Sequence, residues 1–140
     1  MQITRQTEYA IRTMLELAAS PGQILSTKVI SERQDVPELF LKKTVQILAR
    51  AGLVTTQRGT QGGVRLARSG DTITIADIVI AVEGPLALNV CLMPGHICGN
   101  LDTCVVHQIM NRAQNALSKE LSRDTLTDIL KMAEKQKVGV

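Results

Sequence analysis

The chain has 140 residues, of which 44% are hydrophobic and 21% are charged, a composition typical of a globular protein with one domain. This balance excludes a disordered or collagen-like chain. No apolar run approaches the ~18–20 residues of a membrane-spanning helix, and the first residues lack the layout of a signal peptide, so we expect a cytoplasmic protein with no membrane partner. Tyr9 and Phe40 are its only Phe, Tyr or Trp residues, which disfavours binding of single-stranded nucleic acid by stacking.

The charge is divided unevenly along the chain. Residues 1–70 contain ten Lys and Arg against five acids, a formal charge of +5, whereas residues 71–140 contain six bases and eight acids, a formal charge of −2. A basic half suggests a polyanionic partner. Most basic surfaces are simply solvated, so charge alone does not show that this half binds a polyanion. The predicted fold of this half is needed as well.

Two helices are predicted near the N-terminus. Residues 5–19 carry apolar side chains at helical spacing, and Pro21 ends this helix. Ser26 is a suitable N-cap for a second helix over about residues 27–34, and a turn follows at residues 35–36.

A third helix is predicted over about residues 37–51. Pro37 suits its first position, Glu38 suits its positive N-terminal end, and Gly52 is a natural stop. The inward side is apolar and consists of Leu41, Val45 and Leu48. The other side has three cations and no acid and consists of Leu39, Lys42, Lys43, Gln46 and Arg50. An ordinary helical hairpin has this pattern, and so does a helix-turn-helix, which lays its second helix in the major groove of DNA.

A β-hairpin is predicted directly after this helix pair and favours the second interpretation. Residues 53–57 and 64–67 have the pattern of strands, and the turn between them holds Arg58 among three glycines. Glycine lets the backbone approach a phosphate closely, so Arg58 can reach into a narrow minor groove. We therefore expect residues 1–85 to form a winged helix-turn-helix domain that binds DNA, with its wing at about residues 53–67.

The second half of the chain is predicted to contain helices and one loop. Residues 73–75 alternate like a short strand, and residues 75–83 have the pattern of a helix. A loop that is rich in cysteine occupies residues 86–103. Near the end of the chain, Thr125 and Asp128 match a capping box for a last helix.

A long amphipathic helix is predicted between this loop and the last helix, from about residue 103 to residue 122. Its apolar residues recur every three or four positions and are Val106, Ile109, Met110, Ala113, Ala116, Leu117 and Leu121. In so short a chain this helix has little of its own domain to pack against. Proteins with a helix-turn-helix usually bind two-fold symmetric operators as dimers. We expect a homodimer joined through residues 104–121, with residues 104–140 forming the dimerisation helix and the C-terminal helix.

The strongest chemical feature is a cluster of possible metal ligands. The three cysteines, Cys91, Cys98 and Cys104, and both histidines, His96 and His107, lie within seventeen residues. Cysteines that serve only as small buried side chains show no such clustering. A disulfide framework is not expected in a cytoplasmic chain with an odd number of cysteines. The pattern therefore favours metal binding.

Three kinds of cysteine site are compatible with this segment. Zinc would accept the three cysteines with His107, although structural zinc sites favour close cysteine pairs, which this loop lacks. An iron–sulfur cluster accepts thiolates from a wider loop and tolerates a weaker fourth ligand, for which His107, His96 or an acid from elsewhere is available. A thiol redox switch requires only the cysteines.

These features together resemble the Rrf2 family of bacterial transcription regulators over roughly residues 1–135. The resemblance rests on four motifs and on three cysteines in a loop before a long helix. The motifs are the opening Met-Gln-Ile-Thr…Thr-Glu-Tyr-Ala, Ile30-Ser-Glu-Arg-Gln34, Leu48-Ala-Arg-Ala-Gly-Leu-Val54 and Arg58-Gly-x-x-Gly-Gly63. The resemblance implies a mainly α, dimeric winged-helix regulator with a long C-terminal dimerisation helix and a loop that binds an iron–sulfur cluster, either 4Fe-4S or 2Fe-2S.

The resemblance also implies ligands for the cluster. The three cysteines match the cluster-binding cysteines of the family, and His107 matches a histidine ligand of some members. Glu8 lies where other members place an acidic ligand that the partner subunit donates. The fourth ligand is therefore expected to be Glu8 of the partner subunit or His107.

At the DNA interface, Arg58 and Gly59 match the family's wing residues. Lys42 stands where some members carry an acid that affects sequence choice, so the target sequence is expected to differ from theirs. Lys28, Lys43 and Arg50 are expected to bind phosphates, which fixes position without reading sequence. The full set expected at the DNA is Lys28, Leu39, Lys42, Lys43, Gln46, Arg50, Thr56, Arg58, Gly59 and Arg65.

We therefore expect a repressor whose binding to a double-stranded, two-fold symmetric operator depends on an iron–sulfur cluster that senses nitric oxide, redox state or iron status. One alternative is a regulator of the same fold that uses zinc or thiols. Another, from a different class, is an electron-transfer or cluster-carrier protein. An enzyme is not expected, because no nucleophile–base pair or phosphate-binding loop is present outside the cysteine segment.

Overall fold

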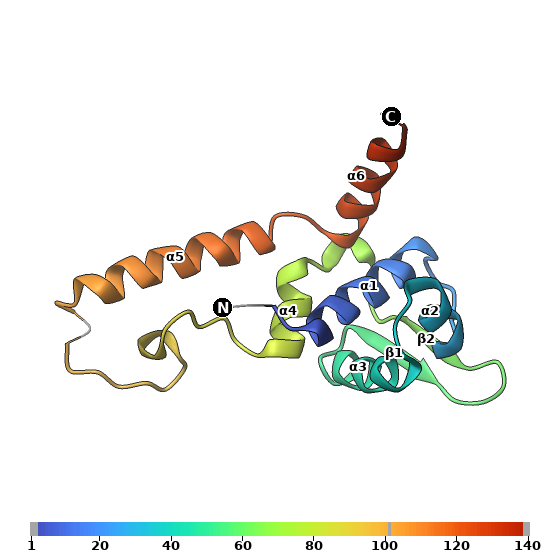
Figure 1. Ribbon diagram of the computed structural model, residues 1–140, viewed down its shortest axis with the longest axis horizontal. Coiled ribbons are helices and arrows are strands. Elements are labelled where there is room, and N and C mark those ends of the chain that lie inside the picture. The colour runs from blue at the N-terminus through green and yellow to red at the C-terminus, as the bar shows by residue number, and fades with distance from the viewer. Residues whose placement is uncertain (1–2, 101, 139–140) are drawn as a thin grey trace.

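The structure, a computed structural model, describes residues 3–100 and 102–138 (Figure 1). Its elements in chain order are α1 (Arg5–Ala19), α2 (Thr27–Gln34), α3 (Glu38–Arg50), β1 (Val54–Gln57), β2 (Gly63–Leu66), the 3-10 helix η1 (Gly70–Thr72), α4 (Ile75–Glu83), the 3-10 helix η2 (Val90–Leu92), α5 (Val105–Leu121) and α6 (Leu126–Val138). The expected mainly α winged helix is confirmed. None of the described helices is both long enough and apolar enough to cross a membrane.

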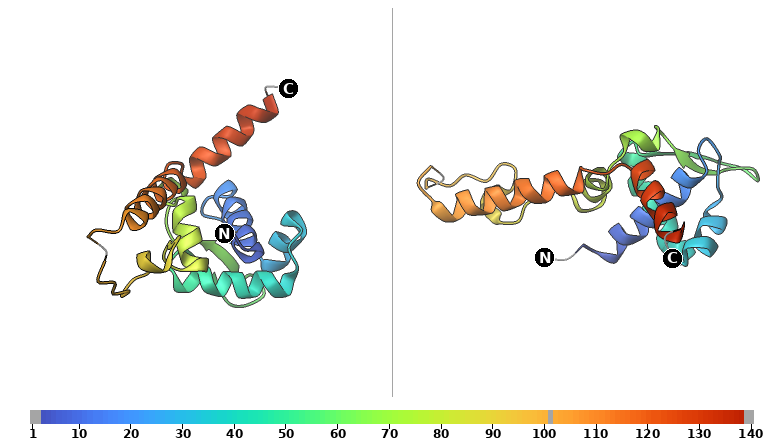
Figure 2. Two further views of the ribbon diagram at one scale, coloured as in Figure 1. Left: turned by 60° about the vertical axis from the view of Figure 1, so that its left-hand side comes forward. Right: turned by 90° about the horizontal axis from the view of Figure 1, so that it is seen from above.

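The core is built around α1, which packs against α2, α3, α4 and α6. Met14 and Leu17 of α1 are buried at its centre. The other large, fully buried apolar side chains come from five further segments and are Ile30, Leu41, Leu48, Ile73, Ile78 and Leu126. Because Leu126 belongs to this core, the beginning of α6 packs onto the same body as the helix-turn-helix, although α5 leads away from that body (Figure 2).

The helix-turn-helix is formed by α2 and α3, as expected. The Ser26 hydroxyl accepts a hydrogen bond from the Val29 backbone N–H and caps α2. Asp35 ends α2 in the left-handed conformation, with a φ of 51°, which aspartate tolerates better than most residues. Pro37 precedes α3 as its N-cap and is not its first helical residue. Gly52 follows the end of α3 with a φ of 76°.

The wing is a two-stranded antiparallel sheet of β1 and β2, paired from Val54 with Leu66 to Gln57 with Gly63. Leu25 exchanges two backbone hydrogen bonds with Val64, at 2.9 and 2.8 Å, and so anchors the wing to the segment before α2. This contact requires glycine at position 63, because a Cβ atom there would lie 2.3 Å from the Leu25 carbonyl oxygen.

The prediction of a strand at residues 73–75 is wrong. Residues 70–72 form η1, and the next residue, Ile73, is fully buried. Thr74 makes only an isolated bridge to Thr125, and no strand of the described residues forms a ladder with this segment. The alternation of apolar residues at this point reflects burial of Ile73 and the start of α4, where Thr74 and Asp77 form a capping box.

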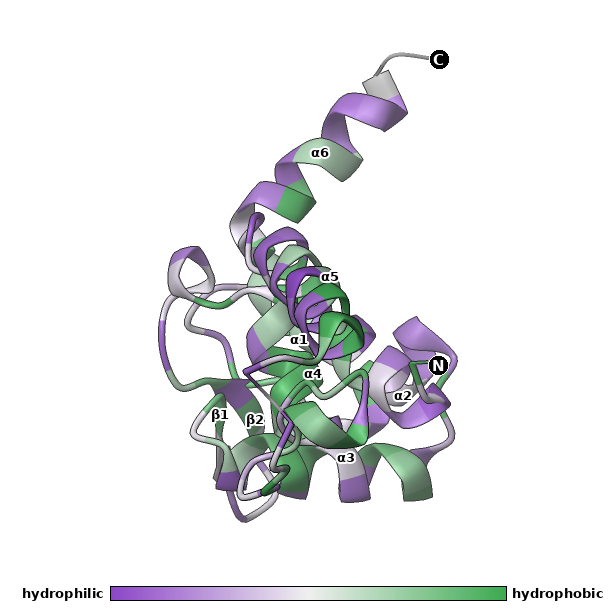
Figure 3. Cartoon of the chain, turned by 90° about the vertical axis from the view of Figure 1, so that its left-hand side faces the viewer, coloured by the Kyte–Doolittle hydropathy of each residue, from purple (hydrophilic) through white to green (hydrophobic). Residues whose placement is uncertain are grey.

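The helix α5 and the loop before it extend away from the core (Figure 2). Among the described residues, none in α5 is buried. The loop runs alongside α5, and the Gln114 side chain accepts a hydrogen bond from the Leu88 backbone N–H at 3.0 Å. Figure 3, which looks nearly along α5, shows hydrophobic residues toward one side of the helix. Val105, Val106 and Ile109 on this helix are 65%, 56% and 47% exposed.

The end of α4 is tied to the beginning of α1 by Glu83. Its carboxylate accepts hydrogen bonds from the Thr4 backbone N–H, at 3.1 Å, and from the hydroxyls of Thr4 and Thr7. The hydrogen bond from the Thr4 side chain, followed by that from Thr7, lowers the pKa of Glu83 below its ordinary value. The charged carboxylate therefore holds the N-terminus of α1 against α4.

We expect the Glu83→Gln substitution to lower the melting temperature by a few degrees at neutral pH, because the loss of about 1 kcal/mol has an effect of that size in a chain of this length. The folded-state pKa of Glu83 is depressed, so its stabilisation is complete above the unfolded-state pKa of ~4.3 and is lost as pH falls through the folded-state value.

Thermal unfolding of both proteins between pH 3 and pH 8 measures this effect. The difference in melting temperature should be constant above about pH 5 and should shrink below it. Glu32→Gln is the matched control, because Glu32 is an exposed acid of α2 without an ion pair among the described residues. Equal melting temperatures of wild type and Glu83→Gln at pH 7 would contradict the assigned role.

Candidate DNA interface and cysteine site

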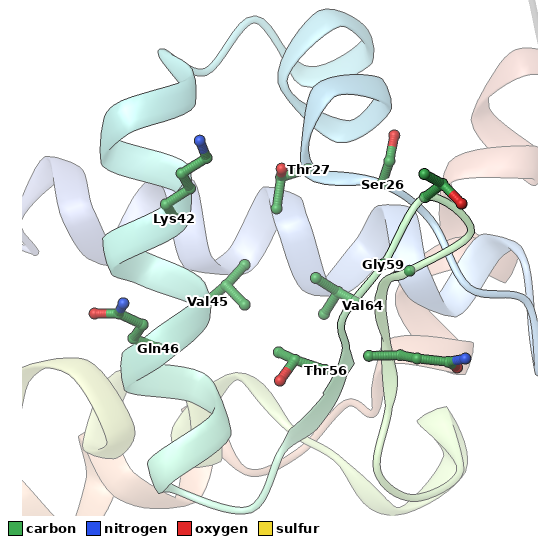
Figure 4. A pocket seen from close by; sticks show the side chains of 12 residues that line it. Ser26, Thr27, Lys42, Val45, Gln46, Thr56, Gly59 and Val64 are labelled. Carbon is green, nitrogen blue, oxygen red and sulfur yellow. The ribbon is translucent and has the colours of Figure 1, made fainter.

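The outer face of α3 and the wing together form the candidate DNA interface. Lys42, Lys43, Gln46 and Arg50 of α3 are all exposed, whereas the opposite side of the helix is buried in the core. Between α3 and the wing lies a groove of about 490 Å³. Figure 4 shows this groove between α3, which carries Lys42 and Gln46, and the wing, which carries Thr56 and Gly59. The structure thus brings together four of the predicted residues from separate segments.

Residues that were not predicted at the DNA also line this groove. Among them are Ser26 and Thr27, at the N-terminus of α2. A helix N-terminus has backbone N–H groups without helical partners and a positive dipole end, and both favour an anion. The predicted Ser26 cap is the feature of the sequence that indicates this helix N-terminus.

Other predicted DNA residues lie outside the groove. Lys28 is exposed on the second position of α2, and Arg58 is exposed in the turn of the wing. Arg65 pairs across the wing with Thr55, and its Nε donates a hydrogen bond to the Thr55 hydroxyl at 3.2 Å. Successive strand residues face opposite sides, so Arg65 lies on the side of the wing opposite to Val64, which lines the groove.

The basic face of α3 is not free of acid, contrary to expectation. The Glu38 carboxylate lies 3.7 Å from the Lys42 ammonium group. Residues four positions apart are neighbours on a helix surface, and an acid at the N-terminal end also interacts favourably with the helix dipole. Glu38 therefore orients Lys42 and partly neutralises it, whereas no described residue makes an ion pair with Lys43 or Arg50.

The candidate cysteine site lies where η2 meets the start of α5. Cys91 is on η2, and its Sγ is 3.2 Å from the His107 Nδ1 atom, within hydrogen-bonding distance. Cys104 is the N-cap of α5, where its Sγ accepts a hydrogen bond from the His107 backbone N–H at 3.5 Å. His107 thus contacts two of the three cysteines, which come from opposite ends of the loop.

The third cysteine, Cys98, lies within the loop and is half-buried, like the other two. His96 is exposed. Within residues 3–100 and 102–138, no three Cys, His, Asp or Glu side chains are close enough together to hold a metal ion. The structure therefore brings the Cys91 and His107 side chains together, whereas Cys104 contacts only the His107 backbone, and the described residues do not form a complete ligand set.

Glu8, the other candidate for a fourth ligand, lies in the first turn of α1. Its side chain is 48% exposed and forms an ion pair with Arg12 one helical turn later. Arg12 also donates a hydrogen bond to the backbone oxygen of Gln34, at the end of α2, over 3.4 Å. The Glu8 carboxylate is therefore accessible to another molecule and is linked through Arg12 to the helix-turn-helix.

Comparison with known proteins agrees with this architecture. Residues 3–132 match the profile of the Rrf2 family, described as iron-dependent transcriptional regulators. A curated relative, protein aau3 of Rhizobium meliloti strain 1021, is 39% identical over 132 residues, which make up 94% of this chain and 86% of that protein.

Two solved structures extend the comparison. IscR of T. potens has a TM-score of 0.77 and 30% identity, over 97% of this chain and 90% of that one. CymR, the global cysteine regulator of B. subtilis, has a TM-score of 0.74 and 28% identity, over 94% of this chain and 98% of that one. These relatives are regulators and not enzymes. The family match covers nearly the whole chain, and the chain therefore belongs to the Rrf2 family of DNA-binding transcriptional regulators.

Proposed function

We propose that this protein is a dimeric repressor whose binding to a two-fold symmetric operator is controlled by an iron–sulfur cluster on Cys91, Cys98 and Cys104. The observation that carries this proposal is the 3.2 Å contact between the His107 Nδ1 atom and the Cys91 Sγ atom, which joins the N-terminal end of the loop to the helix that Cys104 caps. The similarity to IscR is in keeping with it. Membership of a regulator family gives no support to the electron-carrier alternative.

The DNA-binding step uses the groove between α3 and the wing. Lys42 and Gln46 enter the major groove with α3, while Arg58 extends from the wing toward the minor groove. Lys28 and Arg50, at the edges of this surface, bind phosphates and position the protein without reading bases.

Replacement of Arg58 by alanine tests the wing. We expect the affinity for an operator to fall about 10-fold, and the dependence of affinity on salt concentration to become shallower, because a cationic contact is lost. Fluorescence anisotropy with duplexes that the purified protein selects from a random library measures both effects. Arg123→Ala, which removes an exposed arginine from the turn between α5 and α6, is the matched control. An unchanged affinity would remove the wing from the mechanism.

The dimer is formed by the exposed apolar stripe of α5. Val105, Val106 and Ile109 lie at helical spacing on a helix without buried residues among those described, so the stripe is available to a second copy of the same helix. Pairing of the two helices places two α3 helices on one operator.

Replacement of Ile109 by aspartate is expected to convert the protein from a dimer to a monomer, because two charges would then be buried at the helix pair. Sedimentation velocity measures the mass, which should change from twice the chain mass of 15.2 kDa to a single chain mass. Asn111→Asp is the control, since it adds the same charge at an exposed position on another side of α5. A variant Ile109→Asp that remains dimeric would place the interface elsewhere.

The donor set fits an iron–sulfur cluster by its chemistry. Three thiolates with one weaker ligand hold a cluster and leave one iron accessible, and such a cluster supplies sensitivity to oxidants, nitric oxide or iron supply. Binding all three thiolates to one cluster requires the loop to bring the three cysteines together, because no three possible ligands among the described residues lie close enough to hold a metal ion. His107 is the proposed fourth ligand because it contacts Cys91. Glu8 of the partner subunit is the alternative, and in that case Glu8 would release Arg12.

Comparison of His107→Ala with Glu8→Ala distinguishes the two fourth ligands. We expect anaerobically purified wild type and Glu8→Ala to be brown, with near-equal iron and sulfide, and His107→Ala to lose most of both, since one of four ligands is removed. Absorption spectra and iron and sulfide assays measure retention, with the exposed His96→Ala as control. The reverse order of the two variants would assign the ligand to Glu8.

A thiol-based regulator is the second candidate. It is favoured because no three Cys, His, Asp or Glu side chains of the described residues lie close enough together to hold a metal ion. Colourless wild-type protein with zinc, or without any metal, after anaerobic purification would replace the cluster by this candidate or by its zinc form.

A further inference from the structure

The first turn of α3 carries a leucine that the protein itself leaves in solvent. Leu39 is 80% exposed. Single exposed apolar side chains are common on protein surfaces and need no explanation by themselves. An explanation is needed for Leu39 because it lies on the helix that is proposed to face DNA.

Leu39 shares one helix face with the predicted DNA residues. Lys42, Lys43 and Gln46 follow it at three, four and seven positions, which is the spacing of neighbours on one side of a helix. All three are exposed, and two of them line the groove beside the wing. Leu39 lies in the first turn of α3, next to Glu38, which pairs with Lys42. The N-terminal residues of a recognition helix are those that contact base edges in the major groove.

The next residue, Phe40, is 56% exposed, but it has an aromatic neighbour within the chain. Its ring centroid lies 6.3 Å from that of Tyr9 on α1, so this side chain belongs to the contact between α3 and α1. Leu39 has no such partner, as its exposure shows. The lysines beside it attract phosphate groups, which favours DNA over an apolar surface of another protein as the molecule that covers it.

We propose that Leu39 is a specificity-determining residue that packs against the C5 methyl group of a thymine in each half of the operator. Thymine is the only base that presents a methyl group in the major groove. Leucine offers neither a donor nor an acceptor, so against guanine or cytosine it would leave polar base atoms without a hydrogen-bond partner. This inference rests on the proposed function of α3 and names the base that it reads.

The test removes only the methyl group. Duplexes are selected from a random library by the purified full-length protein, and each thymine in the bound sequence is then replaced in turn by deoxyuridine, which keeps every hydrogen-bonding atom. We expect one thymine in each half-site at which this change weakens wild-type binding by about 3–5-fold, the factor that corresponds to one buried methyl group.

The protein variants complete a double-mutant cycle. Leu39→Ala should bind the thymine duplex about 3–5-fold more weakly for each half-site and should no longer distinguish thymine from deoxyuridine. Leu39→Met, which keeps an apolar side chain of similar size, should retain the distinction. Met132→Ala, which removes an apolar side chain that is 44% exposed on α6, is the control and should bind like wild type.

Two results would overturn the inference while the proposed function stands. One is a wild-type protein that is insensitive to every deoxyuridine, and the other is a Leu39→Ala protein that still distinguishes the two bases. If that variant also lost the same affinity for both duplexes, Leu39 would be assigned to another partner or to the structure of α3. Failure to enrich any duplex would overturn the proposed function and this inference together.

Discussion

Burial of one side of α1 determines how α3 and α4 are placed relative to each other. Met14 and Leu17 fill the space between α3 on one side and α4 on the other, and Leu126 of α6 closes the same core. Hydrophobic burial of this kind is the dominant favourable term in folding. Because α1 packs against both α3 and α4, one helix connects α3, which faces the groove beside the wing, with α4, which leads to the cysteine loop.

The attachment also has two polar parts, one at the N-terminus of α1 and one on its outer side. At its N-terminus, Glu83 accepts hydrogen bonds from Thr4 and Thr7. On its outer side, Arg12 connects Glu8 to the last residues of α2. A change at the end of α4, or at Glu8, is therefore linked through α1 to the position of the helix-turn-helix. This arrangement is physically suited to a regulator in which a group bound beyond α4 influences DNA binding.

The structure also separates the stable from the adaptable parts of the chain. The winged helix has a continuous core and a wing that is anchored by backbone hydrogen bonds to Leu25. By contrast, α5 and its loop bury little within one chain and hold Cys91 and Cys104 at two ends of an irregular segment. Surfaces that one chain leaves uncovered are those that a second chain, a cofactor or DNA can cover.

Local patterns in the sequence determined the helices, the wing and the gathering of cysteines in one segment. These depend on neighbours in the chain: the cap of Ser26 on α2, the capping box of Thr125 with Asp128, and the apolar spacing of α3. Family membership also followed from local motifs.

The one wrong element, at residues 73–75, is a place where burial of Ile73 in the core and a single bridge to Thr125 produce an alternation without a strand. Only the tertiary structure decided which distant side chains meet. It decided that His107 contacts Cys91, that Thr56 faces α3 while Arg65 lies on the other side of the wing, and that Glu83 holds α1. The reason is that such contacts depend on how whole elements pack against one another, which no local pattern of residues specifies.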